Sequence, residues 1–201
     1  MTSLEHSILL ANLGTSDLAI KHSKYGYFIP LSFNSEPNLI RPTAGSDEYQ
    51  AWQERDSLLQ EIYGELEIHQ ERPVFRLVTE KLSEKLKQTE DFTKWYPRII
   101  PVRLLGFISQ ALENRKFKNI HTIYLFTTNQ GSPGHISDTV YVFDIIEIWL
   151  ERWLQDKNYK HINIRKIEVD FSPINLDRLF DFYYKKIDGL ISDDQKEITA
   201  L

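Results

Sequence analysis

The chain has 201 residues, of which 41% are hydrophobic and 26% charged, and its formal net charge is −5. A negative net charge argues against broad affinity for duplex DNA, which needs a basic surface. The absence of cysteine excludes disulfides and thiolate metal sites. There is no apolar run of about 18 residues, and no basic residue precedes the first apolar stretch, so we expect a cytoplasmic protein without a membrane segment or signal peptide.

The first half of the chain predicts a strand, a hairpin and three helices. Residues 7–12 are apolar and end at a polar turn, as a buried strand would. Residues 25–33 are aromatic but contain Pro30, which cannot donate to a ladder and therefore favours an edge strand or hairpin. A helix is predicted to begin near Ser46, which can cap it, and to run to about residue 66. Two further helices are predicted over residues 73–88 and 102–114.

The second half alternates strands and helices. Residues 120–128 are β-branched and aromatic almost throughout, which predicts a central, buried strand. Ser137 and Asp138 open an apolar helix to about residue 154, in which Trp149 and Trp153 are predicted core residues. A strand over 161–169 and a helix over 174–190 follow. The pattern predicts an α/β fold, with a Rossmann-like, mostly parallel sheet flanked by helices and an N-terminal β-hairpin insertion. We expect residues 1–190 to form one ligand-binding domain, with 191–201 as a tail or the start of a further segment.

Two polar loops follow the predicted strands. The first is Gly14, Thr15, Ser16 and Asp17; the second contains Thr127, Thr128, Asn129, Gln130 and Gly131. In an open parallel sheet, ligands bind at the carboxyl ends of strands where the strand order reverses, and hydroxyl, amide and backbone groups suit phosphate, ribose and base edges. The same residue types are also ordinary turn and capping residues. His135, in the second loop, could donate to a phosphate or act as a general acid.

Both loops carry a family resemblance. The segment Ile8–Ser16 resembles the first-strand motif of CARF domains, the Rossmann-like domains of CRISPR accessory proteins, in which an apolar strand runs into a Gly-Thr-Ser type loop. Residues 127–130, followed by residues 137–140, resemble the second motif of that family. The resemblance covers roughly residues 7–190.

The resemblance implies a sensor that binds a cyclic oligoadenylate across the axis of a homodimer, in antiviral defence. The candidate ligand-binding residues are those of the two loops, and no metal or other cofactor is expected. An effector domain or protein outside this chain is a further implied partner. One alternative is a metal-independent ring nuclease, with Ser16, Asn129 and His135 as candidate catalytic residues. Another is a regulatory or assembly subunit without a nucleotide ligand.

Overall fold

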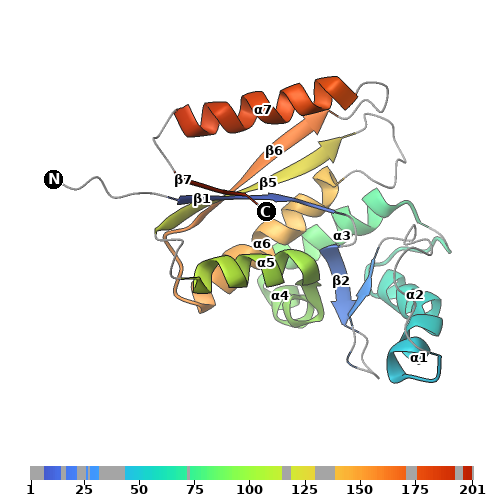
Figure 1. The fold of residues 1–201 in the computed structure, drawn as a ribbon. Coiled ribbons are helices and arrows are strands. Elements are labelled where there is room, and N and C mark those ends of the chain that lie inside the picture. Colours follow the sequence, from blue (N-terminus) through green and yellow to red (C-terminus); the bar gives the residue numbers. More distant parts are fainter. Residues whose placement is uncertain are drawn as a thin grey trace.

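The fold is built around a strand that is buried on both faces. β1 (Ser7–Asn12) buries Ile8 and Leu10 on one side of a sheet and Leu9 and Ala11 on the other, as parallel strands covered by helices do. The computed structural model describes residues 7–14, 17–21, 26, 28–31, 44–71, 73–114, 119–129, 139–170, 176–192 and 197–200. Figure 1 shows β1 in the middle of the main sheet, with helices above and below.

The main sheet has four strands in the order β6-β5-β1-β7. Its other members are β5 (Ile120–Asn129), β6 (Asn163–Asp170) and β7 (Glu197–Ala200), and every neighbouring pair is parallel. β5 lies between β6 and β1, so the prediction that residues 120–128 form an interior strand is confirmed. Residues 197–200, in the stretch predicted as a tail or the start of a further segment, form the edge strand beside β1.

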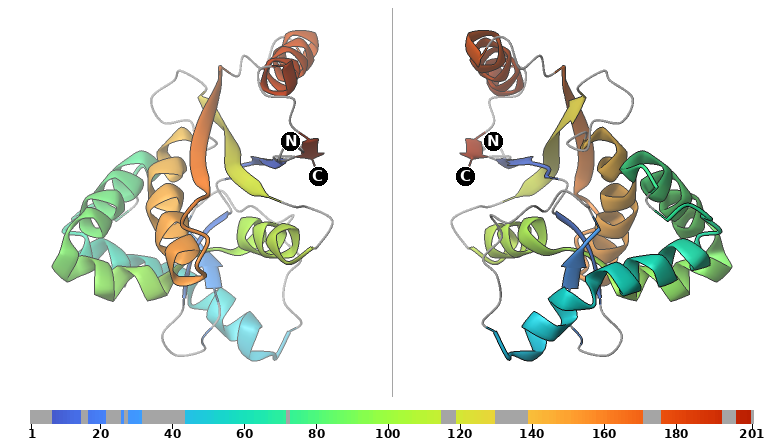
Figure 2. Two further views of the ribbon diagram at one scale, coloured as in Figure 1. Left: turned by 90° about the vertical axis from the view of Figure 1, so that its left-hand side faces the viewer. Right: turned by 90° about the vertical axis from the view of Figure 1, so that its right-hand side faces the viewer.

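Helices cover the two faces of this sheet unequally. α7 (Leu176–Ser192) packs Tyr183 and Ile187 against a small cluster that contains Ile8, Leu10 and Phe126. α5 (Val102–Glu113) and α6 (Val140–Asp156) join a much larger core with Leu9 and the opposite face of β5. Figure 2 shows α7 alone on its side of the sheet, opposite all the other helices. The prediction of a Rossmann-like α/β fold is confirmed.

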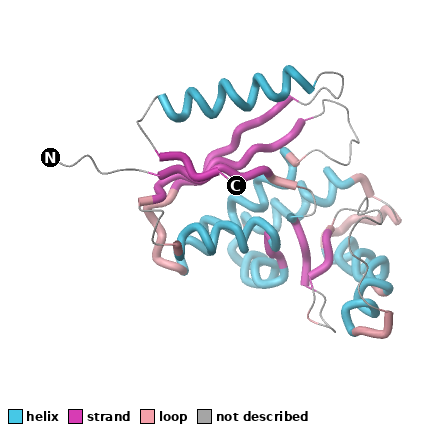
Figure 3. The backbone as a smooth tube through the Cα atoms, in the orientation of Figure 1, coloured by secondary structure: helices cyan, strands magenta, loops and turns pink. Residues whose placement is uncertain are grey.

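A second, three-stranded antiparallel sheet has the order β3-β2-β4 (Figure 3). β2 (Leu18–Lys21) pairs with β3 (Phe28–Pro30) on one side and with β4 (Ile99–Pro101) on the other. A hairpin is present near the N-terminus as predicted, but its first strand, β2, precedes the predicted segment 25–33 and was not itself predicted. Pro30 lies in the edge strand β3, where a missing N–H leaves no ladder position unpaired.

The predicted helix from Ser46 to residue 66 is two helices. Ser46 caps α1 (Asp47–Gln53), because its Oγ accepts a hydrogen bond from the Tyr49 N–H at 3.1 Å. The backbone then leaves helical geometry at Glu54, and α2 (Arg55–Glu65) starts in a new direction. The break allows α2 to bury Leu58, Leu59 and Ile62 in the larger core.

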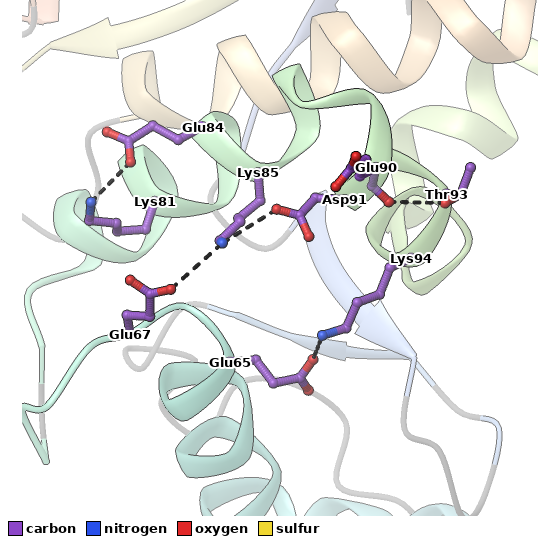
Figure 4. Close-up of polar contacts among 9 residues, drawn as sticks. All are labelled: Glu65, Glu67, Lys81, Glu84, Lys85, Glu90, Asp91, Thr93 and Lys94. Atoms are coloured by element: carbon purple, nitrogen blue, oxygen red, sulfur yellow. Dashed lines mark hydrogen bonds and ion pairs between the residues drawn. The ribbon is translucent and has the colours of Figure 1, made fainter.

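Ion pairs join α2 to the next two helices, α3 (Phe75–Lys87) and α4 (Thr89–Trp95) (Figure 4). Lys85 lies between Glu67 and Asp91, with Nζ–O distances of 3.9 and 3.3 Å, and Lys94 pairs with Glu65 at 2.6 Å. Partly exposed pairs of this kind contribute roughly 1 kcal/mol or less each, so they orient these helices more than they stabilise them. The apolar side chains of α3 provide the larger contribution to packing.

Three elements between α3 and α5 were not predicted. α4 and the 3₁₀ turn η2 (Tyr96–Arg98) follow α3 almost directly and lead into β4.

Trp149 and Trp153 pack where the sequence predicted, with Trp149 buried and stacked on Tyr96 at 5.4 Å between ring centroids. None of the helices in the described ranges is long and apolar enough to cross a membrane.

Candidate functional site

The ends of β1 and β5 lie side by side at one edge of the main sheet. The two strands are parallel neighbours in which Asn12 pairs with Phe126, and the Leu13 N–H continues the pairing by donating to the Phe126 carbonyl at 2.9 Å. The two strands therefore end at the same edge of the sheet, as the site prediction required. We call this region, defined by Asn12–Gly14, Asp17 and Thr127–Asn129, the carboxyl edge.

The strand order also reverses beside β1. The chain passes from β1 to β5 and on to β6 in one direction, and then returns across the sheet to place β7 on the other side of β1. Figure 1 shows α7 making this return over the face opposite α5 and α6. In open parallel sheets, such a reversal leaves a crevice at the carboxyl ends of the strands where ligands commonly bind.

The turn after β1 is held by Asp17. Its carboxylate accepts hydrogen bonds from the Gly14 N–H, at 2.7 Å, and from the Leu104 N–H in the first turn of α5, while the Asp17 N–H donates to the Gly14 carbonyl at 3.0 Å. Asp17 therefore joins the turn after β1 to the first turn of a helix that lies far away in the sequence. Burial raises the pKa of Asp17, against the opposing effects of these amides and of nearby Arg103. Asp17 has a structural role in the turn, and its contact with a ligand stays a prediction.

The end of β5 is tied to α6 and β6. Thr139, the residue before α6, accepts a hydrogen bond on Oγ1 from the Thr128 N–H at 2.7 Å, and the two hydroxyls lie 3.3 Å apart. Asn129 donates from Nδ2 to a carboxylate oxygen of Glu168 on β6 at 2.7 Å. The polar groups of this loop are thus ordered by their neighbours on two different elements.

Thr127 differs from its neighbours. Its side chain is fully buried on the sheet face that carries Leu125 and Ile123, and its Oγ1 has no hydrogen-bond partner among the described residues. A buried hydroxyl without a partner is unfavourable by about 1–3 kcal/mol, so such groups are uncommon in folded proteins. Its position at the end of β5 places an unused donor and acceptor beside the carboxyl edge.

Two helix N-termini lie at this edge. α5 begins where Asp17 contacts Leu104, and α6 begins directly after Thr139, next to Thr128. The first amides of a helix carry partial positive charge and favour anions. Exposed Arg103 adds a full positive charge, whereas Asp17 and Glu168 are already hydrogen-bonded within the protein. Together these groups suit a small ligand with anionic and hydrogen-bonding parts.

Several predicted site residues lie outside the described residues, namely Thr15, Ser16, Gln130, Gly131 and His135. The structure brings Gly14 and Asp17 to the same edge as Thr127, Thr128 and Asn129. It adds two residues that the sequence did not indicate. Glu168 receives the Asn129 amide, and Tyr183 of α7 donates its hydroxyl to Asn12 Oδ1 at 3.3 Å. Glu168 lies in a predicted strand that has one solvent-exposed face. Its hydrogen bond to Asn129 depends on which strand lies beside β5, and the sequence does not reveal that order.

The described residues contain no group of three or more His, Asp or Glu side chains placed to hold a metal ion. Comparisons with protein-family models, with curated proteins and with solved structures found no match.

Proposed function

We propose that the carboxyl edge binds a cyclic oligoadenylate and that the protein is a sensor of this ligand, as its resemblance to CARF domains implies. One observation carries the proposal. The two polar segments that resemble the family motifs lie more than a hundred residues apart in the sequence, yet they end neighbouring parallel strands beside the reversal of strand order.

The available groups suit the parts of such a ligand. Phosphates would lie near the N-termini of α5 and α6 and near Arg103, where positive potential is concentrated. Thr127 is fully buried, so it would shape the end of β5 behind the ligand and not contact the ligand itself. Thr128, Asn129 and Gln130 would read adenine edges or phosphate, and Thr15 and Ser16 would meet ribose or phosphate. Gly14 has no side chain and would let the ligand approach the backbone.

The proposed sensor acts as a homodimer. A cyclic oligoadenylate with an even number of units can have two-fold symmetry, so each protomer can present the same edge to one half of the ring. Binding would change the arrangement of the protomers only to the extent that the ligand prefers one arrangement over another. No observation among the described residues favours cleavage, since Asn129 is hydrogen-bonded to Glu168 and the other two candidate catalytic residues are not described.

A thermal-shift experiment tests the proposal. Cyclic tri-, tetra- and hexa-adenylate are added to the full chain, with linear oligoadenylates as controls. A cyclic ligand at a hundred times its Kd should add about 2.7 kcal/mol of stability, which raises the midpoint by roughly 5–10 °C for a chain of this size. Asn129→Ala should reduce the shift, whereas Gln155→Ala, which removes an exposed amide near the other end of α6, should not.

Chromatography of the ligand after incubation shows whether it remains intact, as expected of a sensor. The proposal is wrong if no cyclic oligoadenylate raises the midpoint, or if linear and cyclic ligands act alike and Asn129→Ala has no effect.

A further inference from the structure

A groove lies between the end of α3, α4 and the second half of α6, with a cavity volume of about 570 Å³. Arg152 on its rim is twelve residues beyond Val140, the first residue of α6, which is roughly 18 Å along a helix. The groove is therefore separate from the carboxyl edge, where α6 begins. Its volume is within the range of about 300–1,000 Å³ that small-molecule sites occupy.

One wall of the groove is a stack of aromatic rings. Phe92 and Tyr96 lie nearly parallel, with centroids 5.0 Å apart and an interplanar angle of 15°, and both are only partly buried. Tyr96 stacks in turn on the buried ring of Trp149, which also donates its indole N–H to the Tyr96 carbonyl at 3.2 Å. The wall is thus anchored in the core, and Phe92, the ring farthest from Trp149, is held in place to receive a flat ligand on its outer face.

The charge on the groove is opposite to that of the protein. The chain has a net charge of −5, yet Lys87 and Arg152 are the charged residues in the lining, and both are cations. Lys87 forms no hydrogen bond or ion pair with another described residue and acts on Glu147 only at longer range. Arg152 pairs through Nε with Asp156 at 3.1 Å, which leaves its remaining N–H donors for other contacts. The rim therefore favours an anion.

We infer that this groove is a second binding site, for a planar aromatic anion of mononucleotide size. The ring would stack on the outer face of Phe92, the end ring of this stack, since Tyr96 lies between Phe92 and Trp149. Bases stack on aromatic side chains in this way in single-stranded nucleic-acid binding. The phosphate would contact Lys87 and Arg152, and the hydroxyl of Thr89, also in the lining, would offer a further hydrogen bond. This inference goes beyond the proposed function and does not depend on it.

The test is titration of the full chain with AMP, measured by calorimetry and by the indole N–H signals of the four tryptophans in ¹H–¹⁵N spectra. We expect AMP to bind more tightly than adenosine or inorganic phosphate, since the groove offers a partner to both halves of the molecule. The Trp149 signal should move, because its indole contacts the Tyr96 carbonyl, while the Trp52 signal in α1 should not. Lys87→Gln and Arg152→Gln should each weaken AMP binding about tenfold, the effect of one lost charge-assisted contact.

Lys160→Gln is the matched control, because it removes one exposed positive charge outside the groove lining. Lys87 and Arg152 are themselves exposed, so unchanged thermal midpoints should show that the variants are folded. The inference is overturned if AMP does not bind at millimolar concentration, or if adenosine binds as tightly as AMP. It is also overturned if binding leaves the Trp149 signal in place and survives both charge substitutions, since AMP would then bind elsewhere, the carboxyl edge included.

Discussion

Thr127→Val should stabilise the ligand-free protein. The Thr127 side chain is fully buried and its Oγ1 has no partner among the described residues, so folding removes a hydroxyl from water without replacing its hydrogen bonds. Valine has nearly the same shape and no polar atom to desolvate. The unpaired group is unfavourable by about 1–3 kcal/mol, and we expect the substitution to recover about 1–2 kcal/mol. For a chain of this size, that gain raises the midpoint of thermal unfolding by roughly 2–8 °C.

The matched control is Thr122→Val on the same strand. Thr122 is also buried, but its Oγ1 lies 2.6 Å from the His121 Nδ1, so the substitution breaks a hydrogen bond that is already made. Urea denaturation of both variants should show Thr122→Val to be less stable by about 0.5–1.5 kcal/mol and Thr127→Val to be more stable. If Thr127→Val is no more stable than the wild type, the hydroxyl has a partner and the reasoning is refuted.

Further predictions concern charge and assembly. Asp17→Leu should lower the free energy of unfolding, measured by urea denaturation, by about 2–4 kcal/mol, because the Gly14 and Leu104 N–H groups lose their acceptor. A variant as stable as the wild type would contradict this. Asp17→Asn retains an acceptor for these N–H groups but does not titrate. Because the pKa of Asp17 is raised in the folded state, the free energy of unfolding of the wild type should fall relative to that of this variant as pH rises. The fall should lie between the ordinary aspartate pKa and the folded-state pKa. Burial would raise the pKa of Glu65, but hydrogen bonds to Arg98 and Lys94 outweigh it and leave that pKa lowered. Glu65→Gln should therefore lower the free energy of unfolding by about 1 kcal/mol at neutral pH. The loss should shrink as pH falls from the ordinary glutamate pKa through the folded-state pKa, and a loss that does not depend on pH would contradict this role of the carboxylate. Light scattering should show a dimer in solution, and a monomer both with and without ligand would contradict the symmetric binding mode.

Strong local signals made most of the fold predictable. The unbroken β-branched run of β5 identified an interior strand, and Ser46 identified the start of α1. The helical stripe of α6 correctly placed Trp149 in the core. Each of these features can be recognised within a single stretch of sequence, because burial on both faces, a cap or a helical face leaves its own residue pattern.

Short elements could not be predicted in this way. β4 has three residues and ends in a proline, and α4 has seven residues directly after α3, so neither provides a periodic pattern long enough to read. The break at Glu54 is not marked by proline or glycine. It follows from the packing of α2 against the core, which is a tertiary effect.

The candidate site was predictable in its parts but not in its connections. The strand-then-polar-turn pattern located Gly14 and Asn129, and the structure confirms that β1 and β5 are neighbours. The hydrogen bond between Asp17 and Leu104 joins a turn to a helix that begins 85 residues later, and the contact between Asn129 and Glu168 depends on which strand lies beside β5. Such contacts are set by topology, which no local residue pattern specifies.

The pairing of β1 with β7 joins opposite ends of the chain, and this shapes how the protein must fold. β1 leaves the ribosome first, but its second neighbour does not exist until residues 197–200 have been made. During that interval β1, with Ile8 and Leu9 fully buried in the finished fold, has an open edge that can pair with other strands. Contacts this distant in sequence also form slowly. Four residues of β7 therefore shield the open edge of β1 from aggregation, and truncation before Glu197 should lower the soluble yield more than the loss of four residues at a sheet edge would suggest.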